Sequence, residues 1–119
     1  MSYLHPEVLD ALLDEIKDAT HIHICSQMPS NHTEATDTYS LGNDSAPSMG
    51  TNGAGDPDGR EFEVAAVTDG SVTDDGTASH VALVDGTRLL LGRALSSTQV
   101  VTEGNPFTLT AFTVRVPAP

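Results

Sequence analysis

The sequence predicts a mainly β fold: an antiparallel β-sandwich or jelly-roll-like barrel of six to seven short strands, with one N-terminal amphipathic α-helix. Three observations predict it. Residues 6–19 carry apolar side chains at helical spacing, residues 61–116 break into short apolar or alternating runs, and Asp-Gly pairs separate several of those runs. A chain of 119 residues fits one hydrophobic core, so we expect a single domain over residues 1–119.

The first expected element is a helix over residues 6–19. Pro6 suits a first helical turn, and Glu7 and Asp10 complement the positive end of the helix dipole. Apolar residues recur at spacings of one, three and four and predict one apolar stripe along the helix. The stripe consists of Val8, Leu9, Leu12, Leu13 and Ile16.

A strand over residues 21–26 is expected next, because two histidines and Cys25 alternate with two isoleucines. Residues 27–59 are then rich in Ser, Thr, Asn, Asp, Gly and Pro, which predicts a long polar loop. Structureless loops of this length are uncommon inside compact domains. We therefore expect this segment to be functional, ordered by a neighbouring subunit, or mobile.

The remaining chain, residues 61–116, is predicted to be β throughout. Asp85-Gly86 between two apolar runs is the strongest hairpin signal. In the last run the apolar residues change parity near Thr110, which predicts a bulge or a crossing between two sheets. The expected strands cover residues 61–68, 71–73, 77–84, 87–95, 98–102 and 107–116.

The charge balance excludes several classes of partner. Seventeen acids against five lysines and arginines give a net charge of −12, and the five cations are scattered along the chain, so we expect no nucleic-acid partner. No apolar run is long enough to span a membrane, and the N-terminus has acids where a signal peptide has positive charge, so we expect no membrane partner and no cleaved leader. Cys25 is the only cysteine, which excludes an intramolecular disulfide.

The same acidity suggests a saline setting. Eleven of the acids are aspartate and only one cation is lysine, which makes the surface hydrated and self-repelling at low salt. Concentrated salt would screen that repulsion. A halophilic protein is one interpretation, and an acidic protein from an ordinary environment is the other.

A metal site on the strand at residues 21–26 is the first chemical candidate. His21, His23 and Cys25 share one strand face, but together they spread over about 13 Å, too far for one ion. A set of His21 and His23 with His80 or His32 is the remaining combination. We expect no metal and no cofactor, and we interpret these side chains as buried or interfacial polar residues of the strand.

Two further patterns are candidates for a calcium site and for a hydrolase nucleophile. Asp56 and Asp58, with Glu61 and Glu63 nearby, resemble a calcium loop, but they lack its twelve-residue ligand register, so we expect a turn. The pair Ser79-His80 lacks the Gly-x-Ser-x-Gly context of a hydrolase nucleophile. We therefore expect no enzymatic activity.

Two tripeptides in the polar segment fit the acceptor pattern for N-glycosylation. They begin at Asn31 and Asn43. Such tripeptides arise often by chance in a segment rich in Ser and Thr, so the sequence leaves open whether either asparagine is modified.

Several segments taken together carry a family resemblance. After the helix they are His23-Ile-Cys-Ser26, Thr38-Tyr-Ser-Leu-Gly42, the hairpin from Ala78 to Leu90, Leu95-Ser-Ser-Thr-Gln99 and Phe107-Thr-Leu-Thr-Ala111. This succession resembles a family of small virion proteins from tailed bacteriophages and tailed archaeal viruses. It covers most of the chain except residues 45–59.

The resemblance implies a structural virion protein, made in the host cytoplasm and located on the capsid surface. The favoured role is a capsid decoration (cement) protein that stabilises the head shell. Its implied partners are the major capsid protein and further copies of itself, with a trimer expected by analogy. The alternative is a vertex turret or a tail-associated module that binds glycans of the host surface.

Overall fold

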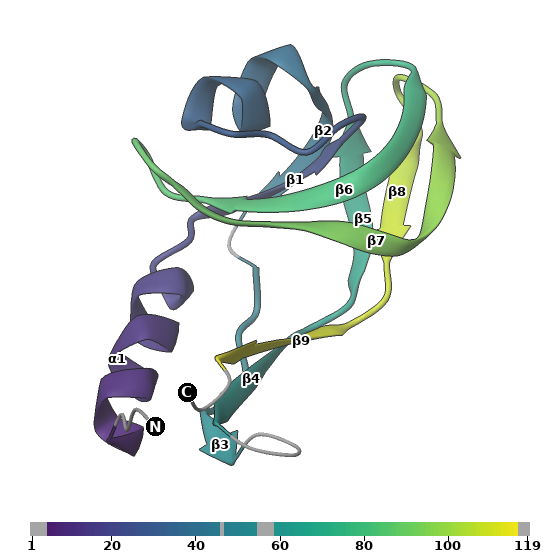
Figure 1. The fold of residues 1–119 in the computed structure, drawn as a ribbon. Coiled ribbons are helices and arrows are strands. Elements are labelled where there is room, and N and C mark those ends of the chain that lie inside the picture. Colours follow the sequence, from purple (N-terminus) through teal and green to yellow (C-terminus); the bar gives the residue numbers. More distant parts are fainter. Residues whose placement is uncertain (1–4, 46, 55–58, 117–119) are drawn as a thin grey trace.

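The computed structural model describes residues 5–45, 47–54 and 59–116. The chain is mainly β with one N-terminal α-helix (Figure 1), which confirms the predicted fold class. A single π-helical turn, η1, lies between the first two strands. The elements in chain order are α1 (Pro6–Lys17), β1 (His21–Cys25), η1 (Glu34–Thr38), β2 (Ser40–Ser45), β3 (Gly53–Ala54), β4 (Arg60–Val64), β5 (Val67–Val72), β6 (Gly76–Val84), β7 (Leu89–Val101), β8 (Pro106–Leu109) and β9 (Phe112–Val116).

Helix α1 begins where the sequence predicts and ends at Lys17, two residues early. The His5 side chain caps its first turn, because Nδ1 accepts a hydrogen bond from the backbone N–H of Glu7 at 3.1 Å. Glu7 in the first turn and Lys17 in the last turn both match the polarity of the helix dipole.

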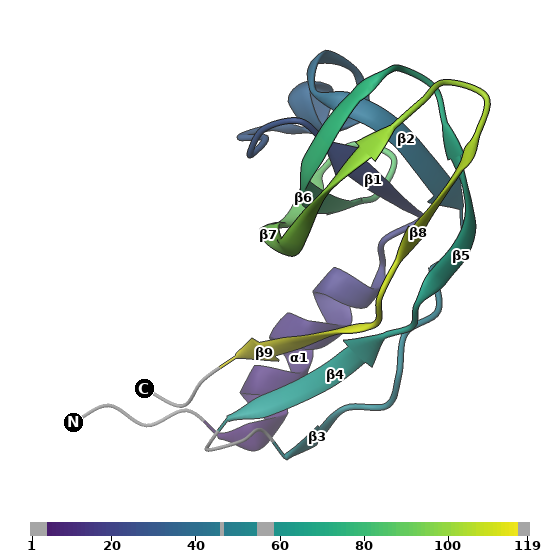
Figure 2. The same ribbon diagram turned by 90° about the vertical axis from the view of Figure 1, so that its right-hand side faces the viewer.

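Only part of the predicted apolar stripe of α1 is covered. Leu9 and Leu13 are buried on the side of the helix that packs against β4 and β9 (Figure 2). Val8 and Leu12 belong to the same stripe, yet each is 47% exposed. One side of the stripe therefore faces solvent.

Six antiparallel strands form a curled sheet in the order β7-β6-β1-β2-β5-β8. Strand β1 lies inside it, with His23 opposite Asn43 of β2 on one side and opposite Ala82 of β6 on the other. A second sheet has three strands in the order β3-β4-β9 and lies beside α1 (Figure 2). The molecule is elongated, with extents of 47 × 24 × 23 Å.

One hydrophobic core joins the helix and both sheets. Leu13 of α1, Ile24 of β1, Phe62 of β4, Phe107 of β8 and Val114 of β9 belong to it. This shared core is what a single domain requires.

A second, smaller cluster lies on the opposite face of the curled sheet. Cys25, Ala82 and Val84 are buried there beneath Ala35 of η1. The sheet is therefore covered on both faces over β1, which explains why four of its five residues are buried.

The prediction of one polar loop over residues 27–59 is wrong, because this segment contains η1, β2 and β3. Strand β2 pairs with β1 and β5 although Leu41 is its only large apolar residue. Backbone hydrogen bonds to the neighbouring strands hold β2 in the sheet. A hydropathy pattern does not detect such a strand, because its side chains are mostly polar. Gly42 permits close packing, since a Cβ there would overlap the Ser71 carbonyl oxygen.

The predicted crossing near Thr110 is confirmed. Strand β8 belongs to the six-stranded sheet and β9, which follows Thr110 and Ala111, belongs to the three-stranded sheet. A matching crossing divides the expected strand at residues 61–68, because β4 lies in the small sheet and β5 in the large one. The described residues form nine strands where six or seven were expected, and the additional strands are β2 and β3 in the segment predicted to be a loop.

The hairpin at Asp85-Gly86 is confirmed, with Val84 paired to Leu89 across a four-residue loop. Strand β7 replaces the two expected strands at residues 87–95 and 98–102. Its register shifts within this stretch: His80 of β6 pairs with Ala94, but Ala78 pairs with Gln99. A bulge of β7 thus lies where the sequence predicts a break between strands.

Candidate functional site

The histidines predicted as candidate metal ligands separate into two places. His21 and His23 have ring centroids 6.3 Å apart and line a hollow of about 360 Å³ that His32 also lines. His80 pairs with Cys25 at the far end of β1, so it does not share this hollow. Within the described ranges no three His, Cys, Asp or Glu side chains are placed to hold a metal ion.

His23 is the most perturbed histidine in the hollow. His23 is only 7% exposed, and its Nδ1 lies 2.9 Å from Ser40 Oγ. Burial first, and then the neighbouring His21 and His32, lower the pKa of His23 to about 4. At neutral pH this imidazole is therefore uncharged and held by a hydroxyl group.

The other nucleophile and base candidates have structural partners. Burial raises the pKa of the Cys25 thiol to about 11, and Sγ donates to the Ala35 carbonyl at 3.6 Å. Ser79 Oγ lies 2.7 Å from His80 Nδ1 and donates to the Ser26 carbonyl at 2.9 Å. The Cys25 contact holds η1 against β1, and the Ser79 contact holds the segment after β1 against β6.

The remaining predicted candidates are dispersed. Asp56 and Asp58 of the expected calcium turn lie outside the described residues, whereas Glu61 and Glu63 project from β4. The two glycosylation candidates differ in setting. Asn31 Oδ1 accepts a hydrogen bond from the Glu34 backbone N–H at 2.8 Å, and Asn43 lies inside β2 and lines the histidine hollow.

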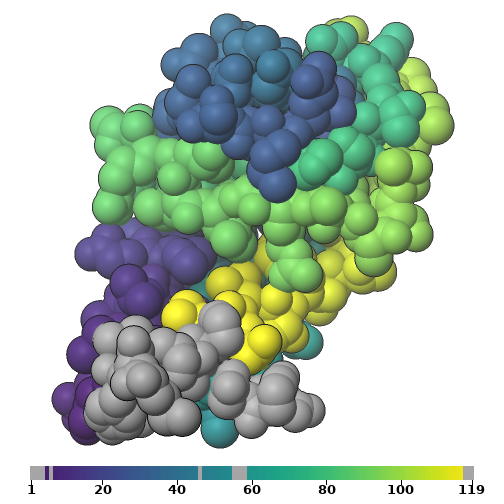
Figure 3. Space-filling model, in the orientation of Figure 1, coloured from purple at the N-terminus to yellow at the C-terminus, as the bar shows by residue number. Residues whose placement is uncertain are grey.

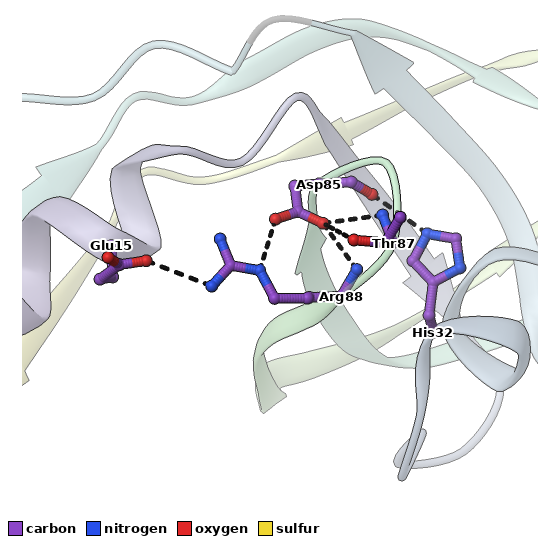
Figure 4. Close-up of polar contacts among 5 residues, drawn as sticks. All are labelled: Glu15, His32, Asp85, Thr87 and Arg88. Atoms are coloured by element: carbon purple, nitrogen blue, oxygen red, sulfur yellow. Dashed lines mark hydrogen bonds and ion pairs between the residues drawn. The ribbon is translucent and has the colours of Figure 1, made fainter.

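A polar network at the β6–β7 loop joins three parts of the chain (Figure 4). The Asp85 carboxylate accepts hydrogen bonds from the backbone N–H groups of Thr87 (2.8 Å) and Arg88 (2.6 Å) and from Arg88 Nε (2.7 Å). These donors, the Thr87 amide first, lower the pKa of Asp85 to about 2. Arg88 also reaches Glu15 of α1 at 3.2 Å, and His32 Nε2 donates to the Asp85 carbonyl at 3.1 Å.

Charge is strongly segregated along the chain, and sequence reasoning missed this feature. Residues 86–119 contain one acid, Glu103, against three arginines, for a net charge of +2. Residues 1–85 contain sixteen acids and two cations, for a net charge of −14. The positions of the cations do not reveal this segregation, because they are scattered along the chain. It appears only when the acids in the two parts of the chain are counted.

Strands β7, β8 and β9 contain no acid, and we call their exposed side chains the acid-free face. Figure 3 shows the side chains of β7, in green, beside those of the yellow C-terminal strands. Val100 of β7 is 80% exposed on this face. In a molecule of net charge −12, these strands themselves contribute no carboxylate, and Glu61 and Glu63 of the neighbouring β4 lie opposite Arg115 and Thr113 of β9.

The acid-free face contains a seam between the two edge strands of the curled sheet, β7 and β8. Two side chains of β7 reach the C-terminal strands: Gln99 Nε2 donates to the Thr108 carbonyl of β8 across the seam at 2.9 Å, and Arg93 Nη1 donates to the Thr113 carbonyl of β9 at 2.6 Å. A hollow of about 250 Å³ lies between β7 and the β8–β9 junction, with Leu95 among its lining residues.

Arg93 differs from the arginines at positions 60 and 88. Arg60 pairs with Asp10 at 2.8 Å, and Arg88 pairs with Asp85 and Glu15. The Arg93 guanidinium lies 5.2 Å from the centroid of the Phe112 ring, and among the described residues no carboxylate pairs with it. It is a positioned cation at the seam.

No protein-family model, curated protein or solved structure matches the chain. The resemblance to virion proteins therefore stays a hypothesis from the sequence. In the described part of the chain, no helix combines the length and apolar character that crossing a membrane requires.

Proposed function

We propose that this protein is a non-enzymatic structural component of a tailed-virus particle, a decoration protein that binds the head shell as a homo-oligomer. The observation that carries the proposal is the acid-free face. The chain has sixteen acids in its first 85 residues but only Glu103 in its last 34, so the three consecutive C-terminal strands β7, β8 and β9 contain none.

Such a face suits protein binding for an electrostatic reason. At physiological salt, charges interact over about 8 Å, so two acidic surfaces pressed together repel each other at contact distances. Strands that contribute no carboxylate reduce this cost. Edge strand β7 adds unpaired backbone groups and the exposed Val100 side chain, both of which favour contact with another polypeptide.

Exposed apolar side chains lie outside this face as well. Val8 and Leu12 of α1 and Met28 after β1 are each close to half exposed. Single exposed apolar residues are common on monomers. They supply additional contact points for a protein that adheres to neighbours in a lattice through many weak contacts.

Electron microscopy of purified particles tests the proposal. Protein labelled through an antibody or a fused tag is expected over the whole shell, and particles that lack it are expected to lose integrity at a lower temperature or under milder osmotic shock. Label confined to vertices or to the tail would instead support a turret or host-binding module. Absence of the protein from particles would refute both roles.

A further inference from the structure

We infer that the hollow beside β1 is an exchangeable site for a divalent transition-metal ion, which the Nε2 atoms of His21 and His23 bind while water completes the coordination. The inference goes beyond the proposed function, since neither decoration of a shell nor host binding requires an ion. It also revises the expectation of no metal from the sequence, because the structure shows how the two imidazoles are held.

Hydrogen bonds determine which nitrogen of His23 is free. Its Nδ1 lies 2.9 Å from Ser40 Oγ, and this hydroxyl donates to the Gly42 carbonyl at 3.4 Å. A hydroxyl has a single hydrogen, so Nδ1 donates to Oγ, and the lone pair of the neutral ring lies on Nε2. A ring N–H that is donated to a fixed acceptor is the arrangement that orients metal-binding histidines.

The Nε2 atom of His23 is open to the hollow. It has no hydrogen-bond partner among the described residues. In the same part of the chain, Asn52 Oδ1 is the only buried side-chain nitrogen or oxygen without a partner, so Nε2 is not sealed in the core. His23 lines the hollow of about 360 Å³, and its lone pair can therefore be reached from that side.

His21 supplies the second imidazole. It lies two residues before His23 on the same face of β1, and it is exposed. Its Nδ1 lies 3.0 Å from Thr20 Oγ1, which leaves Nε2 for the ion. The two ring centroids are 6.3 Å apart, and on one tetrahedral ion they would be about 5 Å apart, because each metal–nitrogen bond is about 2.0–2.1 Å. A small rotation of the exposed His21 ring closes this difference.

The other ionisable groups around the hollow are engaged elsewhere. His32 Nε2 donates to the Asp85 carbonyl at 3.1 Å, and the Asp85 carboxylate accepts hydrogen bonds within its own loop (Figure 4). No third His, Cys, Asp or Glu of the described residues is placed to complete a site with His21 and His23. Two protein ligands leave the other positions to water, so this ion exchanges, unlike a structural zinc ion with four protein ligands.

The ligand atoms select the class of ion. Imidazole nitrogen suits Zn²⁺, Cu²⁺ and Ni²⁺, whereas Ca²⁺ and Mg²⁺ prefer oxygen ligands. Side chains of Thr20, Thr36 and Asn43 line the same hollow and can form hydrogen bonds with metal-bound water. We therefore expect Cu²⁺ to bind more tightly than Zn²⁺, and Ca²⁺ not to bind.

Isothermal titration calorimetry with zinc chloride at neutral pH tests the inference on the full chain without an added histidine tag. His21→Asn and His23→Asn each remove one proposed ligand. His32→Asn is the matched control within the hollow, and His80→Asn is the control outside it. Thermal unfolding verifies that each variant folds, and the exposed position of His21 makes that variant the safer of the two.

We expect the wild type to bind one zinc ion per chain, and either ligand variant to lose about tenfold or more in affinity, with less than about threefold change in the two controls. Ser40→Ala keeps both ligands but removes the acceptor of His23 Nδ1, so it should weaken zinc binding about tenfold. The electron paramagnetic resonance spectrum of the Cu²⁺-loaded wild type should show coupling to two imidazole nitrogens.

A wild-type protein that does not bind zinc would overturn the inference, as would undiminished binding in His21→Asn and His23→Asn. An equal loss of affinity in His32→Asn would overturn the assignment of two ligands, because a third histidine would then hold the ion. Binding that His80→Asn abolishes would place the ion at another site and would also contradict the inference.

Discussion

Acidification is expected to destabilise this fold through His23. The folded protein holds the pKa of His23 at about 4, below the ordinary value of 6.5, because burial disfavours the charged ring. As the pH falls below 6.5, the unfolded chain takes up a proton at this histidine while the folded chain does not. Stability is therefore lost between pH 6.5 and pH 4 and is complete above that window.

The size of this effect follows from the two pKa values. Between pH 7 and pH 5, a single group with these values costs at most about 2 kcal/mol, and partial access of water through the hollow reduces this to about 1 kcal/mol. With a urea dependence of about 1–3 kcal/mol per molar, the unfolding midpoint should fall by roughly 0.3–1 M.

Urea unfolding followed by far-ultraviolet circular dichroism at pH 7 and pH 5 measures this loss. His23→Asn keeps a polar group near Ser40 Oγ but does not titrate, so its midpoint should depend less on pH. His80→Asn is the matched control, because it removes a histidine outside the hollow, and it should retain the wild-type pH dependence. An equal pH dependence in the wild type and His23→Asn would refute the reasoning.

Three further predictions concern stability. Gly70→Ala should lower the melting temperature strongly, because the new Cβ would overlap the buried Phe107 ring, whereas Gly53→Ala meets no atom within 4 Å and should change it little; equal shifts would contradict this account of packing. Asp85→Asn should lower the melting temperature at pH 7, and the difference from wild type should shrink as the pH falls from about 4 toward 2, since the low pKa of Asp85 stabilises the fold only while the carboxylate is ionised; a difference that is constant across this range would exclude that cause. The wild-type melting temperature should rise between low and multimolar salt because screening relieves the repulsion of a net charge of −12, and a melting temperature that does not rise would refute the halophilic interpretation.

Local patterns in the sequence predicted much of the fold. The helix over α1, strand β1, the hairpin at Asp85 and the change of sheet near Thr110 each follow from periodicity or turn chemistry. Strand β2 could not be predicted in this way. It is held by backbone pairing with β1 and β5, and its polar side chains show no pattern typical of a strand.

The candidate site was less predictable. The acids are counted easily in the sequence, but the seam exists only because the sheet curls until β7 and β8 approach each other. Arg93 gains its significance from the Thr113 carbonyl and the Phe112 ring, both about twenty residues away in the chain. Long-range contacts of this kind leave no local pattern.

The copy number of this protein in purified virus particles tests the central proposal most directly. Quantitative mass spectrometry of particles is expected to find it in numbers comparable to those of the shell subunit, because a decoration protein covers the lattice. Absence from particles, or only the few copies that vertices or a tail would hold, would contradict the account.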